Sequence, residues 1–168
     1  MSYIEELFGL EGKTAVVIGG TGELCGAMGV GLARAGAEVV IVGRNEEKAK
    51  EKLKEMEGGR GYFIPCDVGN ADELNALLEK VLERSDKVDI LVNTVGWDRL
   101  QYFTDTDATF WETVININFK GVLNCTAAAL KIMNPNGSGV IVSVSSDASK
   151  QGEPREAVYG AMKAGVNS

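Results

Sequence analysis

The stretch from Thr14 to Met28, TAVVIGGTGELCGAM, decides the fold of this 168-residue chain. It opens on a short run rich in valine and isoleucine and passes through the glycine turn 19–22 into a helical pattern. A strand, a glycine turn and a helix in this order form a phosphate-binding geometry, in which bare backbone approaches a pyrophosphate at a helix N-terminus. No Gly-Lys-Ser/Thr follows, so the turn does not predict a P-loop. Glycine also serves simply to let a helix pack closely on a strand, and the turn alone leaves that interpretation open.

Short apolar runs recur along the rest of the chain and alternate with helical patterns. The runs are nearly unbroken, which is typical of strands buried on both faces of a parallel sheet. They cover Thr14–Ile18, Glu38–Val42, Gly61–Ile64, Val88–Val92 and Gly139–Val144. Helical spacing occupies Leu24–Ala35, Glu46–Met56, Ala71–Glu83 and a long stretch from about Ala108 to Met133. The third helix has the clearest spacing, and Asn70 before it is predicted to form a capping box with Glu73.

The alternation of strands and helices predicts an α/β fold: a doubly wound parallel sheet of the Rossmann type, with three layers and right-handed crossovers. Residues 1–168 then form a single dinucleotide-binding and catalytic domain. A complete fold of this kind has six strands, whereas only five can be counted before Ser168. The sequence therefore predicts a domain that is incomplete at its C-terminus.

Composition argues against several classes of function. The chain has 24 acidic and 17 basic residues, a formal charge of −7 and a pI near 4.7, so it repels polyanions and anionic lipid surfaces. Neither nucleic acid nor a membrane is expected as a partner. The N-terminus lacks the positive start and apolar stretch of a signal peptide, and a cytoplasmic location is expected. The absence of histidine removes Ser-His-Asp triads and HExxH zinc sites, and no metal site is predicted.

The three cysteines, Cys25, Cys66 and Cys125, are an odd number without a CxxC pair. They lie within or beside apolar segments. Reduced, packed thiols are therefore predicted.

Three residues near the end of the chain form the strongest chemical pattern. Ser146 follows the fifth predicted strand, and Lys163 lies one helical turn beyond Tyr159, on the same helix face. Moving a hydride to or from a carbonyl carbon requires a proton at its oxygen, and a phenol with a pKa of about 10 needs a neighbouring cation to act near neutral pH. Lys163 can supply that cation, and Ser146 can orient the substrate oxygen. The Tyr-x-x-x-Lys spacing by itself also arises by chance on many helices.

The pattern of Ser146, Tyr159 and Lys163 resembles the signature of the short-chain dehydrogenase/reductase family. The resemblance covers essentially the whole chain. The loop from Gly19 to Met28 is similar to that of members related to mannonate and fructuronate oxidoreductases. The second half, with Gly96-Trp97-Asp98, resembles dehydrogenases of alicyclic hydroxyacyl-CoA thioesters. The two halves leave a sugar acid, a hydroxyacyl thioester and another ketone open as the substrate.

The resemblance assigns roles residue by residue. It makes Ser146, Tyr159 and Lys163 catalytic, with Asn118 holding a water that completes the proton relay. Cofactor contacts are implied at Gly19, Gly20, Thr21, Gly22, Glu23, Leu24, Asp67, Val68, Asn93, Gly96, Tyr159 and Lys163. Asp67 would bond the adenine ring, although it can equally be a turn or cap residue. Because Ile18, Glu23 and Cys25 depart from the family's Thr, Gly and Gly, a shifted register through Gly22 and Gly26 also stays open.

The end of the second predicted strand bears on the choice of cofactor. NAD-binding folds place an acid there to bond the ribose 2′-hydroxyl, whereas an arginine accommodates a 2′-phosphate. Here Gly43 occupies the acid position and Arg44 follows it. The pattern favours NADP(H) and leaves NAD(H) open, because Arg44 can also be a solvated residue before a helix capped by Asn45, partly neutralised by Glu46 and Glu47.

Together these patterns predict an NAD(P)-dependent oxidoreductase that acts on a small-molecule ketone or secondary alcohol, with tyrosine as the general acid/base. A non-catalytic dinucleotide-binding module is the alternative. The resemblance also implies a C-terminal strand and substrate lid that the chain lacks, and a homo-oligomer, tetramer or dimer, in the full-length form.

Overall fold

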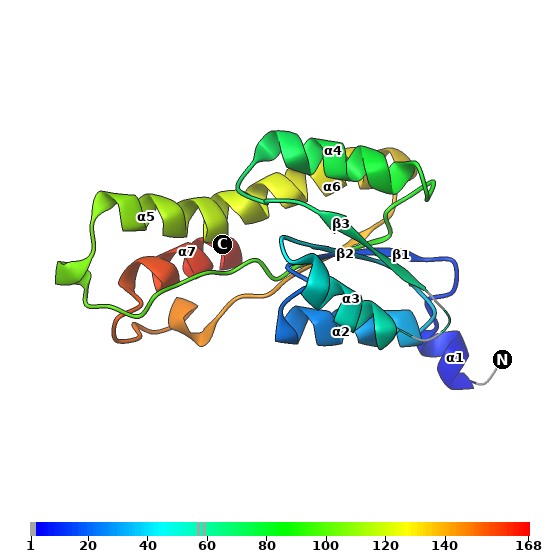
Figure 1. The fold of residues 1–168 in the computed structure, drawn as a ribbon, viewed down its shortest axis with the longest axis horizontal. Helices are drawn as coiled ribbons and strands as arrows, with labels where there is room; N and C mark the ends of the chain where they lie inside the picture. Colours follow the sequence, from blue (N-terminus) through cyan, green and yellow to red (C-terminus); the bar gives the residue numbers. More distant parts are fainter. Residues whose placement is uncertain (1–2, 57, 59) are drawn as a thin grey trace.

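A parallel sheet of five strands organises the computed structural model, which describes residues 3–56, 58 and 60–168 (Figure 1). The strands are β1 (Thr14–Ile18), β2 (Glu38–Gly43), β3 (Gly61–Pro65), β4 (Ile90–Asn93) and β5 (Val140–Ser143). Their spatial order is β3-β2-β1-β4-β5, and every neighbouring pair is parallel. This order matches five consecutive positions of a Rossmann sheet, and the predicted α/β, doubly wound fold is confirmed.

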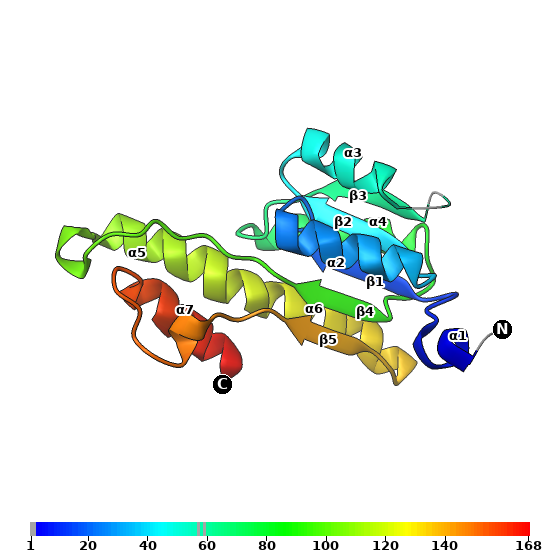
Figure 2. The ribbon, with the colours of Figure 1, turned by 90° about the horizontal axis from the view of Figure 1, so that it is seen from below.

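Helices cover both faces of the sheet and give the predicted three layers (Figures 1 and 2). One face carries α2 (Glu23–Arg34) and α3 (Glu46–Lys54), and the other carries α4 (Ala71–Leu82) and α6 (Gly121–Asn136). Two further helices, α5 (Ala108–Ile115) and α7 (Ala157–Asn167), lie beyond the carboxyl ends of the strands. A short helix that the sequence did not predict, α1 (Tyr3–Phe8), lies at the opposite end.

The sheet separates two apolar clusters, and the strands supply both. On β1, Val16 and Ile18 pack toward one cluster, while Ala15 and Val17 pack toward the other. This alternation explains why the strand sequence is an unbroken apolar run. β5 departs from the expectation of two buried faces, because Val140 and Val142 are 57% and 46% exposed. The exposure marks β5 as an edge strand with one face toward solvent.

The long helix predicted from Ala108 to Met133 is interrupted. A π-helical turn, η3 (Asn116–Lys120), joins α5 to α6, and α6 continues to Asn136 with Pro135 in its last turn. The side-chain amide of Asn118 donates to the carbonyl oxygen of Val114 at 2.9 Å. It takes the acceptor that regular helical bonding would use, which accounts for a widened turn at this position.

Two local predictions differ in detail. β4 begins at Ile90 and not at Val88, and Asp89 just before it bonds to Thr14 twice: its backbone N–H donates to the Thr14 carbonyl oxygen, and its carboxylate accepts the Thr14 N–H, both at 2.9 Å. Asn70 caps α4 as predicted and accepts from the N–H of Glu73. The Glu73 carboxylate, however, accepts from the Asn70 side chain and from the N–H of Asp67, so it ties the β3–α4 loop to the helix.

The three cysteines are free and buried, as predicted. Burial raises the pKa of the Cys66 thiol to about 11 and that of Cys125 to about 12, so both are protonated at neutral pH. Within the part of the chain that the structure describes, no helix has the length and apolar character needed to cross a bilayer.

Candidate active site

The glycine turn joins β1 to α2 at the carboxyl edge of the sheet. Gly19 has a φ of +80°, which a side chain would strain, and a Cβ there would lie 3.1 Å from Thr94 Oγ1. Gly22 is the N-cap of α2, and no side chain caps this helix. The first N–H groups of α2 therefore stay available to an anion.

A cleft of about 280 Å³ runs along the carboxyl ends of β1, β2, β3 and β4. Because these strands are parallel, their following loops meet at one edge of the sheet, where open α/β folds bind ligands. Of the predicted cofactor residues, the following line the cleft: Gly19, Thr21, Gly22, Arg44, Asp67, Val68 and Gly96.

Two predicted cofactor residues serve the sheet and lie outside this lining. Gly20 donates its N–H to the carbonyl oxygen of Val42, and a Cβ there would lie 3.0 Å from Ile41. Asn93 is buried and donates its side-chain amide to Thr126 Oγ1 on α6 at 3.2 Å. Gly20 therefore fastens the turn to β2, and Asn93 fastens β4 to α6.

Arg44 is exposed and lines the cleft at its β2 end. The carboxylates of Glu46 and Glu47 pair with Lys50, at 3.1 and 3.0 Å, and not with Arg44. Asn45 caps α3 by accepting the N–H of Lys48, as predicted. Among the residues that the structure describes, no carboxylate lies within ion-pair distance of Arg44, so its guanidinium is available to a ligand.

Two carboxylates at or beside the cleft are already engaged. Glu23, in the first turn of α2, pairs with Lys52 of α3 at 3.4 Å, and the positive charge of Lys52 partly offsets a carboxylate that by itself would repel a phosphate. Asp67 accepts the N–H of Gly69 at 2.9 Å, the turn geometry that the sequence allowed for it, and still lines the cleft. The turn role is therefore observed, and the contact with an adenine ring stays a prediction.

Ser146, Tyr159 and Lys163 converge on a second cavity of about 440 Å³ that adjoins the cleft through Cys25, Thr94 and Gly96. Glu23 and Leu24 line it too. Ser146 caps the 3-10 turn η4 (Asp147–Ser149), and Tyr159 and Lys163 lie on α7.

Gly160 brings these two elements together, because a Cβ at that position would lie 2.7 Å from the carbonyl oxygen of Ala148 in η4. Sequence reasoning missed this glycine; its only signal is its place beside Tyr159.

Lys163 is only 2% exposed, and its ammonium donates to the carbonyl oxygens of Val95 at 2.9 Å and Val144 at 3.3 Å. Both acceptors lie just beyond β4 and β5, so the sheet itself positions the charge. Nζ lies 5.7 Å from the centroid of the Tyr159 ring. Burial lowers the pKa of Lys163.

Tyr159 has a raised pKa in this structure, mainly because of burial, with Glu156 and Asp98 adding to the rise. A hydrogen bond with Ser146 acts in the opposite direction and favours the phenolate. The expected lowering by Lys163 is not among these influences, because its ammonium is directed at the two carbonyls. Ser146 is the residue that acts on the phenol directly.

Asn118 is fully buried in the π-helical turn. Its Oδ1 accepts the N–H of Trp97 at 3.0 Å, and its Nδ2 donates to the carbonyl oxygen of Trp97 at 2.7 Å. A Cβ on Gly96 would lie 3.5 Å from both Asn118 Oδ1 and Lys163 Nζ. Asn118 therefore clamps the loop after β4 against the Lys163 ammonium.

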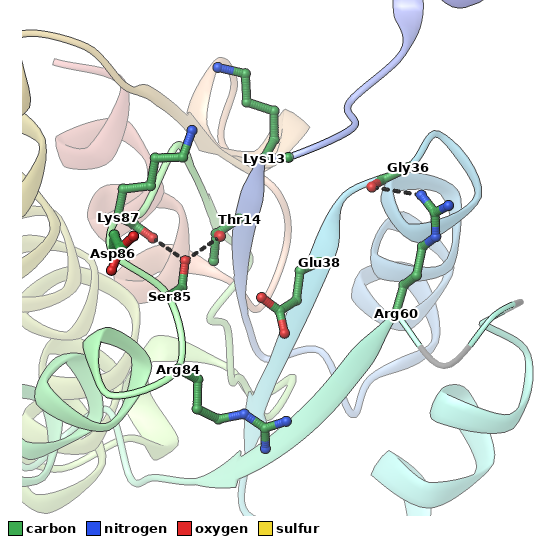
Figure 3. A pocket seen from close by; sticks show the side chains of 10 residues that line it. Lys13, Thr14, Gly36, Glu38, Arg60, Arg84, Ser85, Asp86 and Lys87 are labelled. Atoms are coloured by element: carbon green, nitrogen blue, oxygen red, sulfur yellow. Dashed lines mark hydrogen bonds between the residues drawn. The ribbon is translucent and has the colours of Figure 1, made fainter.

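A larger cavity, of about 570 Å³, lies at the opposite edge of the sheet (Figure 3). Its basic side chains are mostly engaged: Lys13 and Lys87 pair with Asp89, and Arg60 donates to the carbonyl oxygen of Gly36. Arg84 lies over the ring of Tyr62. Burial acts to raise the pKa of Asp89, but bonds from Thr14, Lys13 and Lys87 outweigh it and hold the pKa low. These contacts join β1 to β4 and belong to the scaffold.

Comparison with known proteins identifies relatives of this site. The family model described as short chain dehydrogenase matches residues 13–168. A 3β-hydroxysteroid dehydrogenase of Mediterraneibacter gnavus is 37% identical over 161 residues, which are 92% of this chain and 57% of that protein. A 3-oxoacyl-[acyl-carrier-protein] reductase of Thermotoga maritima is 33% identical, over 94% of this chain and 65% of that protein.

Solved structures agree in fold. A short-chain alcohol dehydrogenase from Sinorhizobium meliloti has a TM-score of 0.90 and 32% identity, over 95% of this chain and 64% of that one. The actinorhodin polyketide ketoreductase variant F189W, solved with NADPH, has a TM-score of 0.87 and 32% identity, over 92% of this chain and 60% of that one. The chain thus spans less than two thirds of these proteins. With its family match and the site at its sheet edge, it belongs to the short-chain dehydrogenase/reductase family of oxidoreductases.

Proposed function

We propose that the protein carrying this chain transfers a hydride between NADP(H) and a ketone or secondary alcohol, with Tyr159 as general acid/base. The observation that carries the proposal is the meeting of Ser146, Tyr159 and a buried Lys163 in a cavity that adjoins the cleft along the strand ends. Such a cavity holds a proton donor, a hydrogen-bonding hydroxyl and a fixed positive charge. These are the groups that reduction of a carbonyl requires besides the hydride.

The cleft suits a dinucleotide on three counts. The uncapped start of α2 offers N–H groups to a pyrophosphate. Gly43 leaves the space next to Thr21 free of a side chain, since a Cβ there would lie 2.7 Å from Thr21 Oγ1. Arg44 offers a planar guanidinium without a competing carboxylate, which favours a 2′-phosphate. The ketoreductase neighbour solved with NADPH supports the same choice by analogy.

In the proposed mechanism the chain's own groups handle the proton and the substrate oxygen. A bound nicotinamide would supply or accept the hydride. Ser146 Oγ donates to the substrate oxygen and shares its developing charge, while the Tyr159 hydroxyl delivers or removes the proton there. The Lys163 ammonium, held by the carbonyl oxygens of Val95 and Val144, supplies a fixed positive charge at the site, and its third N–H could donate to a ribose hydroxyl. Asn118 keeps Trp97 and Gly96 in place around that ammonium, as a positioning residue.

Replacing the proton carrier tests the proposal. Tyr159→Phe keeps the ring and removes the hydroxyl, so kcat should fall by several orders of magnitude while the Kd for NADPH stays nearly unchanged. Turnover is followed by NADPH absorbance with a panel of ketones, and Kd by quenching of tryptophan fluorescence. Turnover of the variant within tenfold of wild type would remove Tyr159 from the mechanism. Tight NADPH binding with no turnover in either protein would favour a cofactor-binding module.

A further inference from the structure

Two acidic residues, Asp98 and Glu156, line the cavity at Tyr159 and do not line the cofactor cleft, and we call them its acidic wall. Asp98, in the loop after β4, and Glu156, at the start of α7, both line this cavity together with Ser146, Tyr159 and Trp97. The negative charges of both carboxylates raise the pKa of Tyr159. A substrate whose carbonyl reaches Ser146 and Tyr159 occupies the cavity that these two carboxylates line.

The two arginines beside these acids in the sequence are held elsewhere. Arg99 donates to Gln101 Oε1 at 3.2 Å and lies 5.7 Å from the centroid of the Phe110 ring. Arg155 lies 5.0 Å from the centroid of the Tyr102 ring, with its NH2 3.5 Å from the phenolic oxygen. Among the described residues, neither Asp98 nor Glu156 has an ion-pair partner, so no cation neutralises this wall by direct pairing.

The backbone just before Glu156 is strained at Arg155. Arg155 has a φ of +69°, in the left-handed region that a residue with a side chain rarely adopts. Its carbonyl oxygen accepts the N–H of Gln101 at 3.3 Å, which ties the loop before α7 to the loop after β4. Strained residues of this kind cluster at ligand sites. Here the strained residue directly precedes Glu156 in the chain.

Asp98 also presents an unsatisfied acceptor. Its Oδ2 is buried and has no hydrogen-bond partner among the described residues. A buried carboxylate oxygen without a donor is costly, so the Asp98 carboxylate is predisposed to accept a hydrogen bond from a group bound in the cavity that this residue lines. A carboxylate or phosphate at the same place would add a like charge.

We propose that Asp98 and Glu156 select the substrate: the ketone or alcohol carries hydrogen-bond donors, as hydroxyl or ammonium groups, on the side facing these residues, and no carboxylate or phosphate there. The inference rests on the proposed function for the position of the reacting carbonyl. Among the substrates left open by the sequence, it favours ketones that carry hydroxyl or amino groups. It disfavours sugar acids that would bind with their carboxylate at this wall.

A matched series of ring ketones tests the selection. The probes are 4-aminocyclohexanone, 4-hydroxycyclohexanone and 4-oxocyclohexanecarboxylate, which share one skeleton and differ in charge. The wild-type protein should reduce the amino and hydroxy rings with a kcat/KM roughly tenfold or more above that of the carboxylate ring. In the double variant Asp98→Asn, Glu156→Gln this preference should fall to about twofold or less. Glu112→Gln, which removes an exposed acid on α5 outside the cavity, should retain it.

Binding gives a readout that does not depend on turnover. Trp97 lines the cavity, so its fluorescence reports occupancy when the other tryptophan is removed as Trp111→Phe. The same order of affinities is expected, with the difference lost in the double variant. If the rings bind in this order but are not reduced, the proposed function fails and the selection stands. Equal binding of the amino and carboxylate rings by wild type, or a preference that survives the double variant, would overturn the selection.

Discussion

Lys163 lies in the interior, and within the part of the chain that the structure describes it has no carboxylate partner. Its ammonium is held by two backbone carbonyls that extend from adjacent strands. Hydrogen bonds to neutral acceptors only partly offset the loss of water around a charge, which is why burial lowers its pKa. A charge kept at such a cost, beside a phenol and two cavities, is typical of a functional site.

Arg44, in contrast, is exposed, and among the described residues no carboxylate pairs with its guanidinium. Arg44→Ala should remove most of a preference for NADPH over NADH, because a charge-assisted contact of about 1.5–3 kcal/mol corresponds to a preference of roughly 10- to 150-fold. Titrating both cofactors at fixed salt measures it. Lys48→Ala, also exposed and near the start of α3, serves as the control. If wild type binds both cofactors equally, or if its preference persists in Arg44→Ala, another residue selects the cofactor.

At the scale of elements, the close approach of α7 to η4 brings Tyr159 next to Ser146. Gly160→Ala would place a methyl group 2.7 Å from the carbonyl oxygen of Ala148 and push the helix off the turn, separating Tyr159 from Ser146. We expect kcat to fall at least tenfold and the free energy of unfolding to fall by about 1–3 kcal/mol. Activity assays and urea denaturation measure the two effects.

Gly152→Ala is the matched control, since a Cβ at Gly152 meets no atom within 4 Å. It should change neither quantity appreciably. Full activity in Gly160→Ala would show that α7 can shift without disturbing the site.

The same scale shows what a sequence can predict. Strands such as β1 were predicted from local apolar runs, and the site was predicted from the spacing of Ser146, Tyr159 and Lys163. Both predictions depend only on residues that are near one another in the sequence. The π-helical turn was missed, since it depends on the contacts of the Asn118 side chain, which donates to Val114 four residues earlier and is held by Trp97 in the loop after β4. The acidic wall was missed for the same reason: Asp98 and Glu156 are far apart in sequence and meet only through the fold.

At the scale of the whole molecule, the sheet has a buried centre and one exposed edge, and α6 carries leucines toward solvent. Leu123 and Leu130 are 52% and 38% exposed and lie seven residues apart, on one face of α6. Large apolar side chains arranged along one helix face favour contact with another helix. The chain has a formal net charge of −7, so two copies repel one another and association would depend on apolar contact.

This arrangement leads to a prediction about assembly through α6. If the protein forms a homo-oligomer through this face, the double variant Leu123→Glu, Leu130→Glu should shift its mass in solution toward the monomer, because four buried charges would face one another across a two-fold interface. Light scattering after gel filtration measures the mass. Leu82→Glu, at a leucine of α4 that is 40% exposed, adds a comparable charge elsewhere and should leave the mass unchanged. An oligomer that persists in the double variant, or one that Leu82→Glu dissociates equally well, would place the interface on another face.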